Sequence, residues 1–103
     1  MHGINLEKPM REETRWRLLR ALDAGRPGKV SETILFRTLD DVELPLSPKG
    51  LRRELDYLRD KDLITITGED DPVWLAELTA DGVDVVEYTV AAPAGISRPK
   101  RYW

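Results

Sequence analysis

Residues 47 to 66 read SPKGLRRELDYLRDKDLITI and contain the clearest helix start in the chain. Ser47 is a residue type that caps helix N-termini, and Pro48 suits the first helical position because its missing N–H needs no partner there. The apolar residues that follow recur at helical spacing and are Leu51, Leu55 and Leu58. The pattern predicts a helix from Pro48 to about Lys61 with a buried leucine face.

A β-hairpin and a short helix are predicted downstream. Residues 63–67 (LITIT) and 73–78 (VWLAEL) are strand-like, and residues 68–72 (GEDDP) between them have turn chemistry. Thr79 is suited to cap a closing helix, which Gly82 weakens because glycine is a poor helix former.

Two further helices are predicted upstream. One runs from Met10 to about Ala24, where apolar residues recur at helical spacing until Gly25 stops it. The second runs from about Ser31 to Leu39 and has one apolar face. Trp16 and Trp74 are expected in the core. Three helices, a hairpin and a last helix predict an α+β fold, and 103 residues suit one domain.

The chain is expected to divide into an arm, a folded domain and a tail, and its charge is uneven. We expect a flexible arm at residues 1–9, the folded domain at residues 10–90 and an extended basic and aromatic tail at residues 91–103. Residues 63–92 contain seven carboxylates and no lysine or arginine, so this third of the chain is strongly acidic. The cations of the tail are Arg98, Lys100 and Arg101.

Composition excludes several function classes. Sixteen lysines and arginines against 19 aspartates and glutamates give a net charge of −3, which excludes a polybasic nucleic-acid binder. No cysteine is present and His2 is the only histidine, so cysteine-ligated zinc, thiol nucleophiles and serine-histidine-aspartate triads are excluded. Phosphate-binding and dinucleotide-binding glycine patterns are also missing, and we therefore expect no enzymatic activity, no cofactor and no metal site. No signal peptide and no apolar run of membrane-spanning length is present, so we expect a cytoplasmic protein outside the membrane.

Two stretches resemble known families. The sequence SPKGLRRELDYLRDKDLITI, followed by VWLAELTADG, resembles the recognition helix, wing and post-wing segment of winged helix-turn-helix regulators, including a Leu-Thr-x-x-Gly motif at residues 78–82. Asp62 stands where such regulators often have glycine. The sequence LTADGVDVVEY, followed by PAGISRP, is similar to the ending of small winged-helix proteins encoded by Mu-like transposable prophages. The resemblance implies a phage-derived winged-helix domain whose third helix enters the major groove of DNA.

The candidate DNA contacts lie on this third helix. When its leucines face the core, Lys49 and Arg53 lie near the opposite face, with Arg52 and Tyr57 on the flanks. Helix-turn-helix docking brings the N-terminal part of this helix to the base edges, where arginine pairs with guanine while lysine and serine hold phosphates. The predicted DNA-binding residues are Ser47, Lys49, Arg52, Arg53 and Tyr57. The alternative is an ordinary solvated helix surface on which Arg52 and Arg53 pair with Asp56.

The predicted wing tip is acidic. Glu69, Asp70 and Asp71 are consecutive at the position where DNA-contacting wings usually carry lysine or arginine, so phosphates would repel them. The simplest interpretation is a polar turn that keeps a hairpin soluble. If DNA is bound, we expect the wing to point away from it or to stay at its margin.

The tail has two interpretations. Arg98, Lys100 and Arg101 lie beside Tyr102 and Trp103, a combination that holds phosphates and stacks on bases or proteins. The same residues are equally consistent with a terminus packed on the domain.

We expect a phage or prophage winged-helix regulator of transcription that binds double-stranded DNA. A homodimer through residues 79–90 is expected, because two copies would double the phosphate contacts. The competing hypothesis is a protein-protein interaction module of the same fold, whose acidic wing and C-terminal third bind a basic partner instead of DNA. The position of the acidic third discriminates them: beside Lys49 and Arg53 it would cancel their field, and on the opposite side it would leave a bipolar molecule.

Overall fold

The computed structural model describes residues 5–101, which fold into four helices and a three-stranded antiparallel sheet, an α+β architecture as expected. In chain order the elements are α1 (Glu7–Ala24), β1 (Val30–Ser31), α2 (Glu32–Asp41), α3 (Pro48–Asp60), β2 (Ile64–Thr67), β3 (Leu75–Leu78) and α4 (Ala80–Val86). Among the described residues, no helix combines the length and the apolar character that a membrane span requires.

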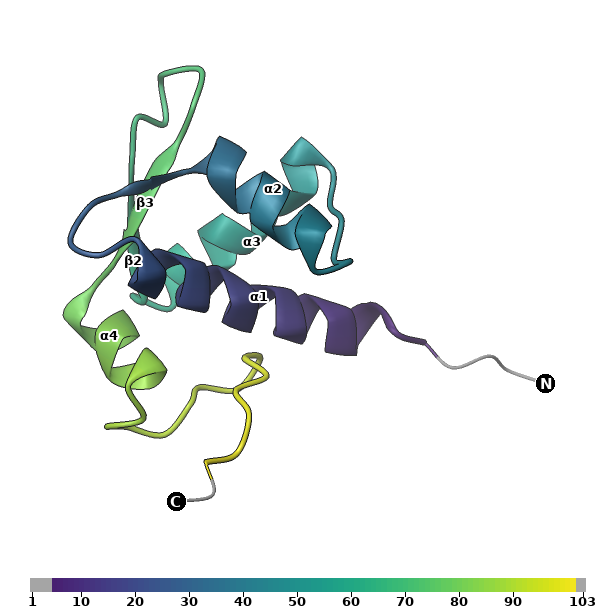
Figure 1. Ribbon diagram of the computed structural model, residues 1–103, viewed down its shortest axis with the longest axis vertical. Coiled ribbons are helices and arrows are strands. Elements are labelled where there is room, and N and C mark those ends of the chain that lie inside the picture. The colour runs from purple at the N-terminus through teal and green to yellow at the C-terminus, as the bar shows by residue number, and fades with distance from the viewer. Residues whose placement is uncertain (1–4, 102–103) are drawn as a thin grey trace.

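Helix α1 lies at the centre of the arrangement. It contacts α2, α3, α4 and β3, with α2 and α3 on one side and α4 on the other (Figure 1). The hairpin formed by β2 and β3 projects beyond the helices (Figure 1). The strand order is β1-β3-β2, and Ala76 in the central strand pairs with Val30 of β1 and with Ile66 of β2.

The core is built mainly from leucines of the first three helices. The predicted apolar face of α3 is confirmed, because Leu51, Leu55 and Leu58 are at most 1% exposed. Trp16 and Trp74 are also buried, as expected. The leucines that α1 and α2 add to this core are Leu18, Leu19, Leu22, Leu35 and Leu39. Since one face of α3 is fully buried, its opposite face points away from the domain.

Both predicted helix caps are present. The Ser47 hydroxyl oxygen accepts a hydrogen bond from the Gly50 N–H at 2.9 Å, and the Thr79 hydroxyl oxygen accepts one from the Gly82 N–H at 3.1 Å. Helix α3 ends at Asp60 with Lys61 as its C-cap, which confirms its predicted bounds. Glycine is required at position 82 because a Cβ there would overlap the backbone oxygen of Leu63.

The structure corrects the predicted start of the first helix and adds one strand. Helix α1 begins at Glu7 and not at Met10, so residues 7–9 are helical and not part of an arm. Pro9 is compatible with this because N–H groups of the first turn have no partner within the helix. Strand β1 was not predicted, because two residues are too short for an alternating pattern and the pairing with β3 defines the strand.

The last helix, capped by Thr79 as predicted, covers only the first part of residues 79–90. It ends at Val86, and Tyr88 has a φ of 64°, which is incompatible with a right-handed helix. The described part of the tail then returns to the domain, where Ile96 is 8% exposed and the Ser97 N–H donates to the Glu12 carbonyl oxygen at 3.2 Å. Residues 1–4, including His2, and residues 102–103 lie outside the described residues.

Candidate nucleic-acid interface

Two cations project from the outer face of the first two turns of α3. Lys49 and Arg53 are one turn apart, both are exposed, and neither forms an ion pair or hydrogen bond with any residue that the structure describes. Ser47, at the start of the same helix, is exposed as well, although its hydroxyl oxygen is engaged in the cap. The structure therefore brings together three of the five predicted DNA-binding residues on one solvent-facing surface.

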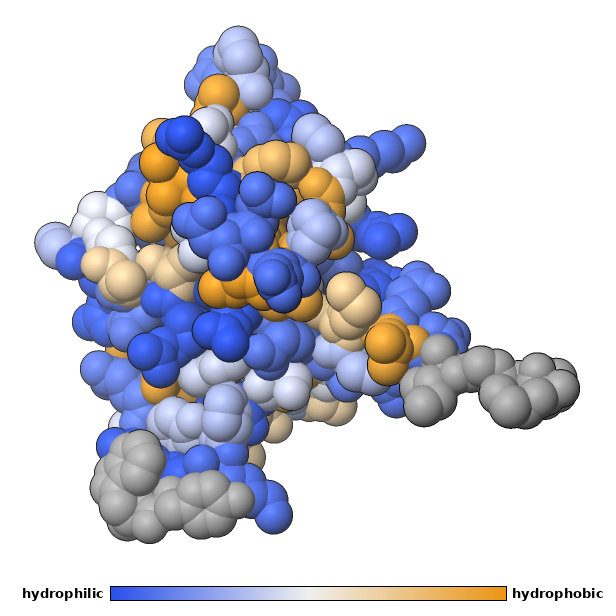
Figure 2. All heavy atoms as spheres, turned by 45° about the vertical axis from the view of Figure 1, so that its right-hand side comes forward, coloured by the Kyte–Doolittle hydropathy of each residue, from blue (hydrophilic) through white to orange (hydrophobic). Residues whose placement is uncertain are grey.

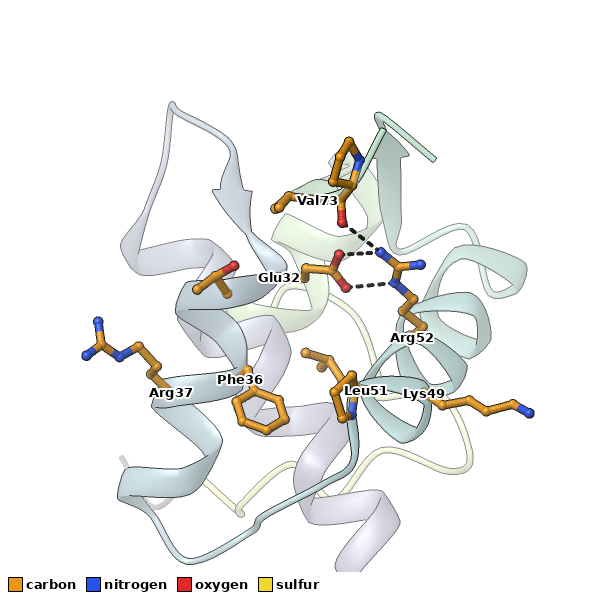
Figure 3. A pocket seen from close by; sticks show the side chains of 10 residues that line it. Glu32, Phe36, Arg37, Lys49, Leu51, Arg52 and Val73 are labelled. Atoms are coloured by element: carbon orange, nitrogen blue, oxygen red, sulfur yellow. Dashed lines mark hydrogen bonds and ion pairs between the residues drawn. The ribbon is translucent and has the colours of Figure 1, made fainter. Parts of the chain in front are cut away.

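Arg52, the neighbour of Arg53, has a structural role. Its Nε and Nη2 donate to the two carboxylate oxygens of Glu32 at 2.9 and 2.6 Å (Figure 3). Nη2 also donates to the Pro72 carbonyl oxygen at 3.2 Å, and the guanidinium lies 4.4 Å from the centre of the Trp74 ring. Arg52 thus joins α3 to the start of α2 and to the hairpin.

Glu32 completes this connection. Its Oε1 also accepts a hydrogen bond from the Trp74 N–H at 3.0 Å. The hydrogen bonds from Arg52 are the main reason why the pKa of the Glu32 carboxyl lies below its ordinary value, and they outweigh the opposing effect of burial. The same pairing raises the pKa of Arg52, so both groups stay charged at neutral pH. Sequence reasoning missed Glu32 because it lies 20 residues from Arg52, and nothing in the local pattern indicates the pair.

The alternative interpretation, in which Arg52 and Arg53 pair with Asp56, differs from the structure, where Arg52 is paired with Glu32 and Asp56 with Arg59. Asp56 accepts a hydrogen bond from Nη2 of Arg59, three residues further along the same helix, at 2.6 Å. Arg59 also forms an ion pair with Glu69 of the hairpin, and this hydrogen bond raises the pKa of Arg59. Arg59 therefore fixes the base of the acidic turn against α3 and leaves Arg53 unpaired among the described residues.

Tyr57 is the second predicted contact that lies elsewhere. Its hydroxyl donates to the Ala94 carbonyl oxygen at 3.3 Å, and the guanidinium of Arg15 lies 3.6 Å from its ring centre. Tyr57 therefore faces α1 and the returning tail, away from the surface that carries Lys49 and Arg53.

The described part of the tail packs on the α4 side of the molecule. Arg98 donates to the Val85 and Val90 carbonyl oxygens at 2.9 and 2.8 Å, and its guanidinium lies 4.2 Å from the Tyr88 ring centre. Arg101 donates to the Glu87 carbonyl oxygen at 3.2 Å. Of the three tail cations, Lys100 is exposed and forms no ion pair within the described residues. These contacts favour the packed-terminus interpretation, while Tyr102 and Trp103 lie outside the described residues.

The acidic third of the chain is divided between two places. The turn that carries Glu69, Asp70 and Asp71 is held beside α3 by Arg59, whereas α4 with Asp81 and Asp84 lies across α1 from α3 (Figure 1). The acidic residues of α4 therefore do not cancel the field of the α3 cations, and within the acidic third it is the hairpin turn that lies beside α3. Asp56 of α3 also lies close to Arg53, but its carboxylate is paired with Arg59. Among the described residues, no group of acidic or histidine side chains is arranged to hold a metal ion.

Residues 79–90, the segment predicted to form a homodimer, bury part of their apolar side within the same chain. Val85 and Val86 are 2% and 7% exposed and belong to the core, so they are not available to a second copy. The homodimer itself stays a prediction.

Comparison of the chain with protein-family models, with curated proteins and with solved structures found no match. Its function is therefore inferred from the geometry of its own residues.

Proposed function

We propose that the chain is a winged-helix protein that binds double-stranded DNA and regulates transcription, with α3 in the major groove and the β2–β3 hairpin as the wing. The element order α1-β1-α2-α3-β2-β3, with a three-stranded antiparallel sheet, supports this assignment. The backbone at Asp62, directly after α3, supports it too, because its φ of 60° is a conformation that glycine favours and winged-helix regulators often have glycine there.

The observation that carries the proposal is that Lys49 and Arg53, on the outer face of α3, form no ion pair with any residue that the structure describes. A helix buried by its leucine face and charged on its free face is shaped to enter a groove. Arg53 would pair with guanine in bidentate fashion, and Lys49 would neutralise a phosphate. Ser47 would donate its hydroxyl proton to a second phosphate while its oxygen still caps the helix. Arg52 takes no part in base recognition, because Glu32 already holds its guanidinium.

The acidic turn of the hairpin determines which side of the domain the DNA would contact. Arg59 neutralises Glu69, but Asp70 and Asp71 are exposed and form no ion pair with the described residues. Phosphates would be repelled from these two carboxylates. The DNA would therefore contact α3 with the wing at its margin.

The proposal is tested by measuring the salt dependence of binding. Fluorescein-labelled double-stranded genomic fragments of about 25 base pairs are titrated with the purified chain at several salt concentrations, with fluorescence anisotropy as the signal. The test variant is Lys49→Ala with Arg53→Ala. The control is Lys8→Ala with Lys29→Ala, which removes the same charge from two exposed cations that do not belong to α3.

The α3 variant is expected to bind at least about tenfold more weakly and to show a salt slope smaller by about one to two. The control variant should bind almost like the wild type. Equal weakening of both variants would show that only net charge matters, and an unchanged α3 variant would remove α3 from the interface.

A further inference from the structure

A cavity of about 640 Å³ opens between α2, α3 and the end of the hairpin turn (Figure 3). Phe36 of α2, Leu51 and Pro48 of α3, and Val73 of the hairpin give it a mainly apolar wall. Its volume lies in the range of pockets that bind organic groups, roughly 300 to 1,000 Å³. Figure 2 shows apolar patches among hydrophilic side chains toward the end of the molecule that carries α2, α3 and the hairpin.

The mouth of the cavity is positively charged. Arg37 of α2 and Lys49 of α3 stand on its two sides, and neither forms an ion pair with a described residue. Among the described residues, the one carboxylate in the wall is Glu32, which is neutralised by Arg52 and also accepts a hydrogen bond from the Trp74 N–H. An occupant would therefore meet an apolar interior and two uncompensated cations at the rim.

We propose that this cavity binds an acidic peptide segment of a partner protein, which inserts one bulky apolar side chain and places carboxylates at Arg37 and Lys49. The two cations come from different helices and point away from the cavity in opposite directions (Figure 3). A compact molecule inside the cavity would not satisfy both of them, whereas a chain that crosses the mouth presents groups on both sides. Carboxylates on either side of an apolar anchor match this charge pattern.

The wall favours an apolar side chain over a nucleobase. A base would bring hydrogen-bonding edges into the cavity, where leaving them unpaired is costly. In the wall, Thr33 supplies one hydroxyl, while the carboxylate of Glu32 is already engaged. A leucine or phenylalanine side chain makes no such demand and buries apolar surface against Phe36 and the exposed Val73.

This inference is independent of DNA binding, although the two share Lys49. If the chain also binds DNA as proposed above, the peptide and the DNA compete for the start of α3. The peptide test is carried out without DNA, so its outcome does not depend on the proposed function.

The probes are fluorescein-labelled peptides of about ten residues with a central leucine or phenylalanine flanked by aspartates. The matched peptides have alanine in the centre, or lysines in place of the aspartates. Thr33→Trp fills the cavity from an exposed position, and Arg37→Glu reverses one rim charge. The controls are Ile34→Trp, an exposed position of the same helix outside the cavity wall, and Lys29→Glu, an exposed cation away from the mouth. Circular dichroism establishes that every variant is folded.

We expect saturable binding of the leucine or phenylalanine peptide, weakened about tenfold or more by Thr33→Trp, by Arg37→Glu or by the central alanine. The two control variants should bind like the wild type, and the lysine peptide should not bind. The proposal is overturned if neither acidic peptide binds, if Ile34→Trp weakens binding as much as Thr33→Trp, or if the lysine peptide binds equally well. It is also overturned, in favour of nucleic acid, if a single-stranded oligonucleotide binds in a way that Thr33→Trp abolishes and the peptides do not.

Discussion

Replacing Glu54 by glutamine tests what holds α3 in place. The Glu54 side chain is 0% exposed, and its two oxygens accept hydrogen bonds from Arg11 Nε at 2.9 Å and from Arg15 Nε at 2.8 Å. The Arg15 side chain is 9% exposed and also donates to the Gly95 carbonyl oxygen at 3.1 Å. One carboxylate on α3 therefore connects this helix to α1, and Arg15 connects both to the returning tail.

Glutamine keeps the shape of Glu54 but removes its charge and one of its two acceptor oxygens. Arg15 would then be a buried cation without a counter-charge, and breaking a buried pair in this way costs about 3 to 5 kcal/mol. The whole domain is expected to have a free energy of unfolding of about 5 to 15 kcal/mol. Each kcal/mol lowers the Tm of a domain of this size by about 4 °C or more, so Glu54→Gln should lower it by at least about 12 °C.

Urea and thermal unfolding, followed by circular dichroism, give the measurement. The matched control is Arg11→Gln, which removes the partner whose side chain is 33% exposed and should cost less than Glu54→Gln, because Arg15 still balances the charge of Glu54. The double variant Glu54→Leu with Arg15→Leu should recover much of the loss, because it removes the unpaired charge together with its partner. A Glu54→Gln protein within about 1 kcal/mol of the wild type would refute the reasoning, since the buried charge would then cost almost nothing.

Two further predictions concern the parts that flank α3. Gly82→Ala should destabilise the domain by about 1 to 3 kcal/mol in urea unfolding, although alanine favours helices, because the added Cβ overlaps the Leu63 backbone oxygen; a stabilised variant would contradict this. The wild type should be more stable than Glu32→Gln at neutral pH, because the pKa of Glu32 is lowered in the folded state. The difference in the free energy of unfolding should be fully present above the ordinary glutamate pKa of 4.5 and should be lost as the pH falls through the lower pKa of the folded state. A difference that stays the same between pH 7 and pH 3 would show that Arg52 does not hold the Glu32 carboxylate.

Local sequence signals predicted the helices and the hairpin well where the chemistry is local. Ser47 and Thr79 cap their helices as predicted, since the cap bond reaches only three residues along the chain. The leucine spacing of α3 predicted its buried face, and the same geometry placed Lys49 and Arg53 outside. Strand β1 could not be found in this way, because its two residues become a strand only through pairing with β3.

The candidate site was predicted less completely, and the reason lies in long-range partners. Helical periodicity placed Arg52 and Tyr57 on the flanks of α3, where either solvent or another element could cover them. In the structure Arg52 is paired with Glu32, and the Tyr57 hydroxyl donates a hydrogen bond to the Ala94 carbonyl oxygen in the returning chain. These partners lie 20 and 37 residues away, so no pattern within one helix could reveal them.

The two adjacent arginines of α3 show how one helix serves the fold and a surface at once. Arg52, whose side chain is partly exposed, neutralises Glu32 and joins α2 and the hairpin to the start of α3. This pairing also leaves the rim of the nearby cavity positive, because the charge of Glu32, a carboxylate in its wall, is balanced by Arg52 and does not offset Arg37 and Lys49. Arg53 remains outside with no partner among the described residues. A variant that removes both arginines would therefore mix loss of packing with loss of binding, and only Lys49 and Arg53 together give a clean test of the outer surface.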